Sequence, residues 1–360
     1  MLKYNSKPTI LVIGGSSYLG SVITQDLLTQ NYNVRATTTE IKNIESLFDV
    51  NKISNLKIYK ANFKDDTFAW LEKMESCDII IIAGSPNDVK LLKKPANYLV
   101  DLILNGINNI FDAAIKSKVK KLIYVSCVTA LIPTKTTKSK QKYFNESNWA
   151  PESDLDTLSK SKFVAEKRIW ALYNKHKDQI NVSVVVPGLI LGPSLKRELS
   201  LSTLFIKKVF DQELTKIPKI SFPIVDVRDV SQAIIKIMED EKTNGERYLV
   251  VQGSYWWYDI VSILNHEFRK YGYELPEQSF NSWFLKLVIW WKKDPFLILI
   301  KPYIDGELIF DTSKYLNDIK GKYRKIEETV IDFVYDMIKK GMIEDKLIFS
   351  ADENDPSFLQ

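Results

Sequence analysis

Short strand-forming runs alternate with amphipathic segments along most of the chain. Six β-strands are predicted at 10–13, 33–38, 56–60, 78–83, 121–126 and 182–186. The run at 78–83 is almost wholly apolar, which is typical of a parallel strand covered on both faces. Apolar positions recur with helical spacing between the strands, most clearly over 98–116 and 156–175. Strands that alternate with helices in this way predict an α/β fold with a doubly wound parallel sheet.

The pattern changes near residue 190. We expect a main domain over 8–190, joined by 222–240, where a strand-like segment enters an amphipathic helix. Residues 191–221 and 241–350 are predicted to form a smaller C-terminal α/β lobe, and the acidic 351–360 segment a flexible tail. The polar segment 135–151 is predicted to be a loop.

A glycine-containing turn follows the first strand and is a candidate binding site for a phosphate group. Gly14 and Gly20 bracket the sequence GGSSYLG, and a helix with Val22, Ile23 and Leu27 on one face comes next. In a Rossmann-type fold, such a turn brings backbone N–H groups at a helix N-terminus to the pyrophosphate of a dinucleotide. Gly14 would permit the tight turn, and Gly20 would let the helix pack closely. An ordinary strand–helix turn is the alternative interpretation.

Composition narrows the remaining possibilities. The 360 residues carry a net charge of +5 from 50 basic and 45 acidic side chains, a mixed surface that does not predict nucleic-acid binding. Two cysteines and two histidines argue against a disulfide framework, a metal site and a histidine triad, and favour a reducing, cytoplasmic location. The apolar run at 283–291 contains Lys286 and is too short to span a membrane. We expect no signal peptide before the first strand, and we expect a monomer or homodimer.

Several segments together resemble one family, the extended short-chain dehydrogenase/reductases, in the branch of dihydroflavonol-reductase-like and 3β-hydroxysteroid-dehydrogenase-like proteins. The similar segments are GGSSYLGS, CDIIIIAGSP, NGINNIFDAA, KLIYVSCVTA, TLSKSKFVAEKRIW, VVVPGLILGP and VDVRDVSQAI. The resemblance extends over about 10–345. It implies an NAD(P)-dependent oxidoreductase that moves a hydride between a nicotinamide cofactor and a small carbonyl or alcohol.

The resemblance also implies which residues bind the cofactor. The candidates are Gly14, Ser16, Ser17, Tyr18, Leu19, Gly20, Thr38, Thr39, Lys42, Asn62, Phe63, Ala83, Gly84, Ser85, Lys162, Pro187 and Gly188. Two of them depart from the family pattern, because Ser17 stands at the middle glycine of TGxxGxxG and Asn62 where an Asp is common.

Cofactor choice depends on the end of the second strand. An acid there binds the ribose 2′-OH of NAD, whereas a nearby cation accepts the 2′-phosphate of NADP. Thr38 has no carboxylate to bind the ribose of NAD. Thr39 provides a hydroxyl and Lys42 a positive charge for a 2′-phosphate, whereas the negative charge of Glu40 would repel it. Either NADP(H) or NAD(H) is therefore expected, with NADP(H) slightly favoured.

The catalytic positions are altered. Lys162 matches the active-site lysine of the family's YxxSK motif, but Leu158 stands where the catalytic Tyr belongs. Leucine has no proton to donate. Cys127 occupies the position of the substrate-orienting Ser, and a thiol is a weak donor. Thr129 and Ser126 flank it as substitutes.

Two functional hypotheses follow. The chain is either an oxidoreductase that uses a displaced acid or water, or a catalytically silent protein that binds a dinucleotide or another ligand in a regulatory or scaffold role. Tyr143, in the loop before the catalytic helix, is the first displaced acid to consider. Tyr173 and Tyr335 each precede a lysine by four residues, but the first lies far along its helix and the second lies in the lobe. The small-molecule substrate or ligand cannot be read from the sequence.

Overall fold

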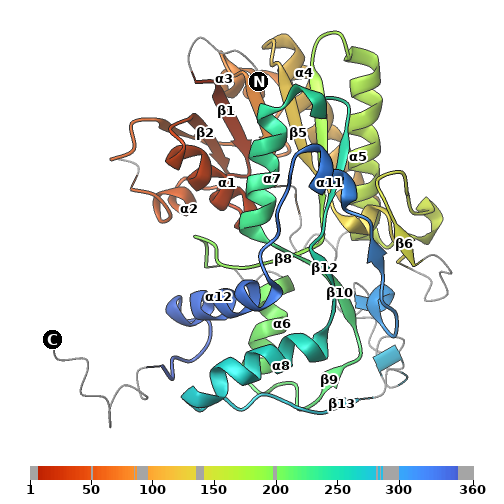
Figure 1. Cartoon of the computed structure of the whole chain (residues 1–360). Helices are drawn as coiled ribbons and strands as arrows, with labels where there is room; N and C mark the ends of the chain where they lie inside the picture. The colour runs from red at the N-terminus through yellow and green to blue at the C-terminus, as the bar shows by residue number, and fades with distance from the viewer. Residues whose placement is uncertain are drawn as a thin grey trace.

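A seven-stranded parallel sheet forms the centre of the protein. The computed structural model describes residues 7–49, 52–84, 86, 96–134, 142–197, 201–280, 283, 285–286 and 300–347. The strands are β1 (Thr9–Ile13), β2 (Asn33–Thr38), β3 (Leu56–Lys60), β4 (Ile79–Ile82), β5 (Lys121–Val125), β7 (Asn181–Pro187) and β11 (Arg247–Val250). Their order is β11-β7-β5-β4-β1-β2-β3, and every neighbouring pair is parallel. This is the doubly wound order of a Rossmann-type fold, so the predicted fold class is confirmed (Figure 1).

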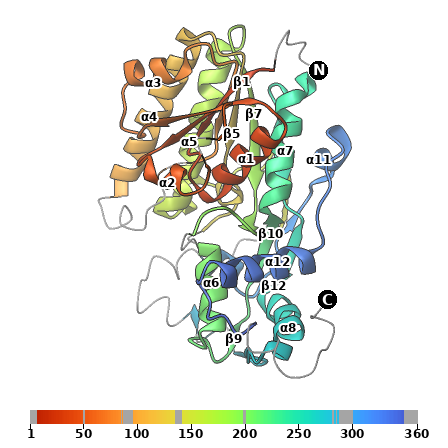
Figure 2. The same cartoon turned by 90° about the vertical axis from the view of Figure 1, so that its left-hand side faces the viewer.

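Helices cover both faces of this sheet. They are α1 (Tyr18–Thr29), α3 (Thr67–Met74), α4 (Ala96–Lys116), α5 (Thr157–His176) and α7 (Val227–Glu239). Helix α1 packs against α7, and α4 packs against α3 and α5; Figure 2 shows the sheet between the α1–α7 pair and the α3–α4 pair. The side chains that cap the N-termini of four of these helices are Ser17, Asp66, Asp156 and Asp226.

The core is divided by the sheet. In β1, Ile10 and Val12 join the apolar cluster under α1 and α7, while Leu11 and Ile13 join the cluster on the other side. All four are almost wholly buried. Because successive strand residues face opposite ways, a strand covered on both faces must be apolar at every position.

Smaller elements lie beyond the C-terminal ends of the main strands (Figures 1 and 2). One sheet has the order β12-β10-β8, from Gly253–Trp256, Ser221–Asp226 and Leu189–Leu191. Two strand pairs join β9 (Ile217–Pro218) to β13 (Ser279–Phe280) and β6 (Tyr143–Phe144) to β14 (Ile309–Phe310). The helices of this part are α6 (Leu201–Phe210), α8 (Trp257–Phe268) and α12 (Ile326–Lys339), while α2 (Lys42–Glu45) follows β2 and α11 (Ser313–Asp318) contacts β11.

The structure divides the chain differently from the sequence prediction in three places. Strand β11 lies in the main sheet, although 241–350 was expected in the lobe; Gly245 turns the chain at φ +78° and donates to the carbonyl of Val182 at 2.7 Å. Segment 222–240 is split, since β10 belongs to the smaller sheet and only α7 covers the main one. The expected loop 135–151 contains β6, which β14 holds by two backbone hydrogen bonds.

Other sequence predictions fall partly outside the described residues. The tail at 351–360, residues 135–141 and most of 283–291 are among these. Of the helices in the described part of the chain, none is long and apolar enough to cross a membrane.

Candidate functional site

The turn between β1 and α1 has almost no free space around its glycines. Gly14 has φ +82°, and a Cβ there would lie 2.8 Å from the Cα of Gly84 at the end of β4. A Cβ on Gly20 would lie 2.0 Å from the carbonyl oxygen of Gly14. Both positions therefore require glycine, because a Cβ at either one would collide with the main chain of the protein itself.

Ser17 caps the helix that this turn begins. Its Oγ accepts a hydrogen bond from the Gly20 N–H at 3.1 Å, and its own N–H donates to the Gly14 carbonyl at 2.8 Å. The next two N–H groups, of Tyr18 and Leu19, have no acceptor within the helix, as at any helix start. The serine thus uses one of the N-terminal donors and leaves two that an anion could accept.

The side chains of Tyr18 and Leu19 point away from any such anion. The Tyr18 hydroxyl donates to the carbonyl of Gly192, its ring packs on Phe333, and burial raises its pKa well above the usual value. Leu19 is buried in the core beneath α1 and α7. Both residues can therefore serve a dinucleotide only through their main chain.

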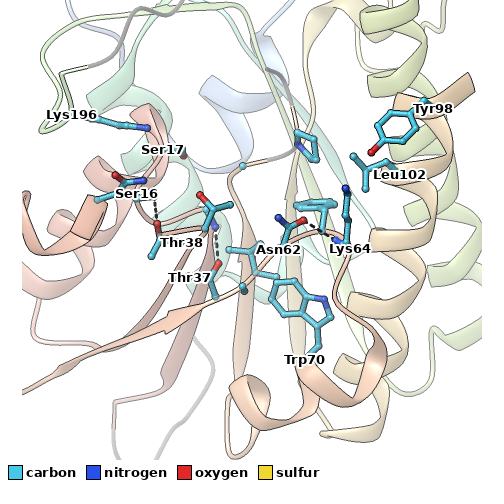
Figure 3. Close-up of a pocket in the computed structure, with 18 residues that line it drawn as sticks. Ser16, Ser17, Thr37, Thr38, Asn62, Lys64, Trp70, Tyr98, Leu102 and Lys196 are labelled. Atoms are coloured by element: carbon cyan, nitrogen blue, oxygen red, sulfur yellow. Dashed lines mark hydrogen bonds between the residues drawn. The ribbon is translucent and has the colours of Figure 1, made fainter. Parts of the chain in front are cut away.

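A cavity of about 470 Å³ opens beside this turn, at the C-terminal ends of β1, β2, β3 and β4. Figure 3 shows Tyr98 and Leu102 of α4 at one end and Lys196 at the other. The sequence-predicted residues that line it are Gly14, Ser16, Ser17, Thr38, Thr39, Asn62, Phe63 and Gly84. The lining residues that sequence reasoning missed include Asn43, Lys64, Trp70, Tyr98, Leu102 and Lys196. Ligands of doubly wound sheets bind at this edge.

The end of β2 is fixed by hydroxyl contacts. The Oγ of Ser16 and the Oγ1 of Thr38 lie 2.8 Å apart, and the Thr37 hydroxyl accepts from the Gly14 N–H at 3.1 Å. Thr38 is 3% exposed, whereas Thr39 and Lys42 lie at the surface. Lys42 is not among the lining residues, so the structure does not place its charge in the cavity.

The residues after β3 shape the opposite wall. The Oδ1 of Asn62 accepts from the Lys64 N–H at 3.0 Å, which fixes the tight turn that carries Phe63. A Cβ on Gly106 of α4 would lie 2.5 Å from the Phe63 ring, so this glycine lets the helix approach the ring. The wall therefore presents an amide and an aromatic side chain, which suits a flat heteroaromatic group.

The predicted catalytic residues lie at the ends of β5 and α5. Cys127 directly precedes a short 3-10 helix (Val128–Ala130) that includes Thr129 and packs against α5. Leu158 is in the first turn of α5 and Lys162 is one turn further on. Desolvation lowers the pKa of Lys162, and the nearby Cys127 acts in the opposite direction. The Leu158 side chain packs against the apolar core and offers no proton.

The hydroxyls that could replace the missing Tyr are mostly engaged elsewhere. Ser126 donates to Glu166 at 2.5 Å. Tyr143 is 54% exposed, and its pKa is raised by partial desolvation and by Asp311, to which it hydrogen bonds. Tyr173 packs against Trp170, and Tyr335 donates to Glu267 at 2.6 Å.

Tyr303 is a phenol near this site that sequence reasoning missed. It is buried in the smaller part of the molecule, where its ring lies 5.1 Å from that of Phe222. Burial raises its pKa well above the usual value, with Cys127 and Asp156 acting in the same direction. It belongs to no motif and follows Leu158 at a long sequence distance, so only the folded chain brings it near the catalytic positions.

Three further predicted cofactor residues lie on the same edge of the sheet. Ala83 precedes Gly84 at the end of β4. Pro187 is the last residue of β7 and Gly188 follows it; both are buried, and a Cβ on Gly188 would lie 2.5 Å from the carbonyl oxygen of Pro223. None of the three is a lining residue of the cavity, and Ser85 lies outside the described residues.

A parallel sheet whose first strand leads through a glycine turn into a helix, beside a cavity at the strand ends, defines a dinucleotide-binding α/β protein. The chain belongs to the NAD dependent epimerase/dehydratase family, whose model matches residues 10–250. The predicted resemblance to extended short-chain dehydrogenase/reductases is therefore confirmed, and so is the predicted cofactor class of the family.

Individual relatives are reductases by name. The chain is 28% identical to an anthocyanidin reductase of Arabidopsis thaliana, over 78% of this chain and 89% of the relative. It is 26% identical to cinnamoyl-CoA reductase 2 of the same plant, over 92% and 93% of the two chains.

Solved structures share the fold at lower identity. A yeast methylglyoxal/isovaleraldehyde reductase complexed with NADPH superimposes with a TM-score of 0.76 at 20% identity, over 93% of this chain and 99% of the other. Vestitone reductase from alfalfa (Medicago sativa) gives 0.72 at 20% identity, over 94% and 100%.

Proposed function

We propose that this protein binds NADP(H) or NAD(H) at the C-terminal edge of its main sheet. The observation that carries this proposal is the cavity at the ends of β1, β2, β3 and β4, which Gly14, Ser17 and Gly84 line beside the N-terminus of α1. The pyrophosphate would accept from the N–H groups of Tyr18 and Leu19. The adenosine half would lie between Thr38 and Asn62, with Phe63 alongside.

The bound cofactor would supply or accept a hydride at a small carbonyl or alcohol. Lys162, one turn beyond Leu158, would hold the nicotinamide ribose. Its pKa is lowered by desolvation, so contact with ribose hydroxyls would compensate for the lost hydration of its ammonium group. Pro187 and Gly188, at the end of β7, would border the nicotinamide.

We further propose that proton transfer is the weak step. A positioned general acid contributes about 10² to 10⁴-fold, and Leu158 has no such group. Cys127 is a weaker donor than serine for orienting a substrate oxygen, and Thr129, two residues further on, would be its substitute because Ser126 donates to Glu166. The protein would then bind a dinucleotide with little conventional turnover. A silent protein that binds a dinucleotide or another ligand is the second candidate, which the same substitutions support.

The test restores the missing groups. Leu158→Tyr combined with Cys127→Ser is expected to raise carbonyl reduction at least about tenfold over wild type, since it supplies both an acid and an oxygen-orienting donor. Initial rates with panels of aldehydes and ketones in the presence of NADPH measure this.

The matched control is Leu158→Phe combined with Cys127→Ser, which adds the ring without the hydroxyl and should lack the part of the gain that the acid supplies. Robust wild-type turnover that does not respond to changes at Leu158 would contradict the silent interpretation. Tyr143→Phe and Tyr303→Phe would then identify a displaced acid by loss of that turnover.

The predicted roles of the C-terminal lobe, the oligomeric state and the cellular location complete this proposal. The smaller sheet and helices, over 191–221 and most of 241–350, would form a lobe that binds the small-molecule substrate or ligand. We propose a monomer or homodimer in the cytoplasm, without a nucleic-acid partner.

A further inference from the structure

Residues 192–197, which follow β8, form a segment that hydrogen bonds to two neighbouring helices, α1 and α12. At α1, the hydroxyl of Tyr18 donates to the carbonyl of Gly192. At α12, the Ser194 N–H donates to Asp336 at 3.3 Å, and Lys340 donates to the Ser194 carbonyl. The segment is therefore tied to the helix of the glycine turn and to a helix of the smaller part of the molecule.

Lys196 extends from this segment into the cavity. It lines the same cavity as Ser16 and Ser17, and Figure 3 shows its amine directed towards the glycine turn. The Ser194 hydroxyl donates to the Lys196 carbonyl at 3.2 Å, which fixes the backbone that carries the side chain. The anchoring contacts thus place an ammonium group opposite the start of α1.

The charges of the cavity favour an anionic ligand at this end. None of the described residues that line it is acidic, and Lys64 and Lys196 are basic. The two lysines are not equivalent, because Lys64 lies at the other end, with its Nζ 5.9 Å from the centroid of the Tyr98 ring. Of these two lysines, Lys196 is therefore the one at the end of the cavity where the glycine turn lies. In that turn, the Ser17 hydroxyl already accepts from the Gly20 N–H at the start of α1.

We propose that Lys196 contacts a phosphate of the bound dinucleotide and supplies positive charge that the end of β2 does not place in the cavity. The inference rests on the proposed dinucleotide binding. An ammonium group binds phosphate as a point charge and tolerates several geometries. The phosphate is either the pyrophosphate, which NAD(H) and NADP(H) share, or the 2′-phosphate, which only NADP(H) carries.

The test measures affinity and not turnover. Isothermal titration of wild type and Lys196→Gln with NADPH and with NADH is expected to show at least about fivefold weaker binding of NADPH by the variant. Equal weakening for NADH would assign the contact to the pyrophosphate. Weakening confined to NADPH would assign it to the 2′-phosphate, and Lys196→Arg should retain most of the affinity in either case.

Lys207→Gln on α6 is the matched control, because it removes the same charge from a lysine that pairs with Asp211 and does not line the cavity. Melting temperatures of the ligand-free variants check that each remains folded. Unchanged affinity of Lys196→Gln for both nucleotides, with wild type binding normally, would overturn the role of Lys196 alone. Failure of wild type to bind either nucleotide would overturn the proposed function and this inference together.

Discussion

Ser17 shows how one side chain can occupy a donor at a helix N-terminus without changing the fold. A glycine at this place would leave the start of α1 open, whereas the serine hydroxyl accepts from the Gly20 N–H. The helix gains a cap, and the site loses one donor for a phosphate. Gly14 and Gly20 cannot be replaced in the same way, because a Cβ at either position would collide with main-chain atoms.

Replacement of Ser17 tests this interpretation. Ser17→Gly is expected to tighten NADPH binding about two- to tenfold, the equivalent of one net hydrogen bond, since the Gly20 N–H becomes available. Titration calorimetry measures the change, and Ser17→Ala, which frees the donor but keeps the Cβ, separates the donor from the space. Unchanged or weaker binding by Ser17→Gly would identify the native hydroxyl as a phosphate contact.

At the scale of elements, a buried ion pair holds α5 against the sheet. Glu166 of α5 accepts from Arg247 of β11 at 2.6 Å and from Ser126, at the end of β5. The Arg247 guanidinium also donates to the carbonyls of Glu146 and Asn148. Because Cys127 follows Ser126 and Lys162 lies one turn before Glu166, this pair fixes the elements that carry both predicted catalytic positions.

Removal of the arginine should be costly. Arg247→Met leaves the Glu166 carboxylate buried without its ion-pair partner, and we expect the free energy of unfolding to fall by about 3–5 kcal/mol. Arg269→Met is the control, since Arg269 and Glu277 pair at the surface with side chains 74% and 63% exposed, and should cost below about 1 kcal/mol. Urea unfolding of both variants measures the difference; equal small losses would show that the buried pair does not anchor α5.

The strands of the main sheet were predictable, because short apolar or alternating runs lie between turn-forming residues. The expected bounds of β2 and β3 agree with the structure at both ends, and those of the fully buried β4 agree to within one residue. The position of β11 was not predictable, since the short run RYLV suits either sheet and only pairing with β7 decides between them. Two-residue strands such as β6 have no periodicity to detect, and only their partner in the fold defines them.

At the scale of the whole molecule, the site is assembled from segments far apart in the sequence. Motifs located Gly14, Gly84, Cys127 and Lys162, because those residues lie at the ends of strands or on a helix with a characteristic pattern. Lys196 and Tyr303 carry no motif, so only the fold places Lys196 in the cavity lining and Tyr303 near Cys127. Sequence therefore predicted part of the cavity lining, at the ends of the strands, and missed the part contributed by α4 and by the segment after β8.

The central claim is that this protein binds a nicotinamide dinucleotide. The most direct test is to titrate the wild-type protein with NADPH, NADP, NADH and NAD, and to measure binding by thermal unfolding and by calorimetry. A ligand that binds only the folded state stabilises it by about 2.7 kcal/mol at a hundred times its Kd, so NADPH is expected to raise the melting temperature in a concentration-dependent way. NADP(H) should bind at least as tightly as NAD(H), because no carboxylate stands at Thr38 to repel a 2′-phosphate. Tenfold tighter binding of NAD(H) would reverse the cofactor preference, and no shift with any of the four nucleotides would contradict the account.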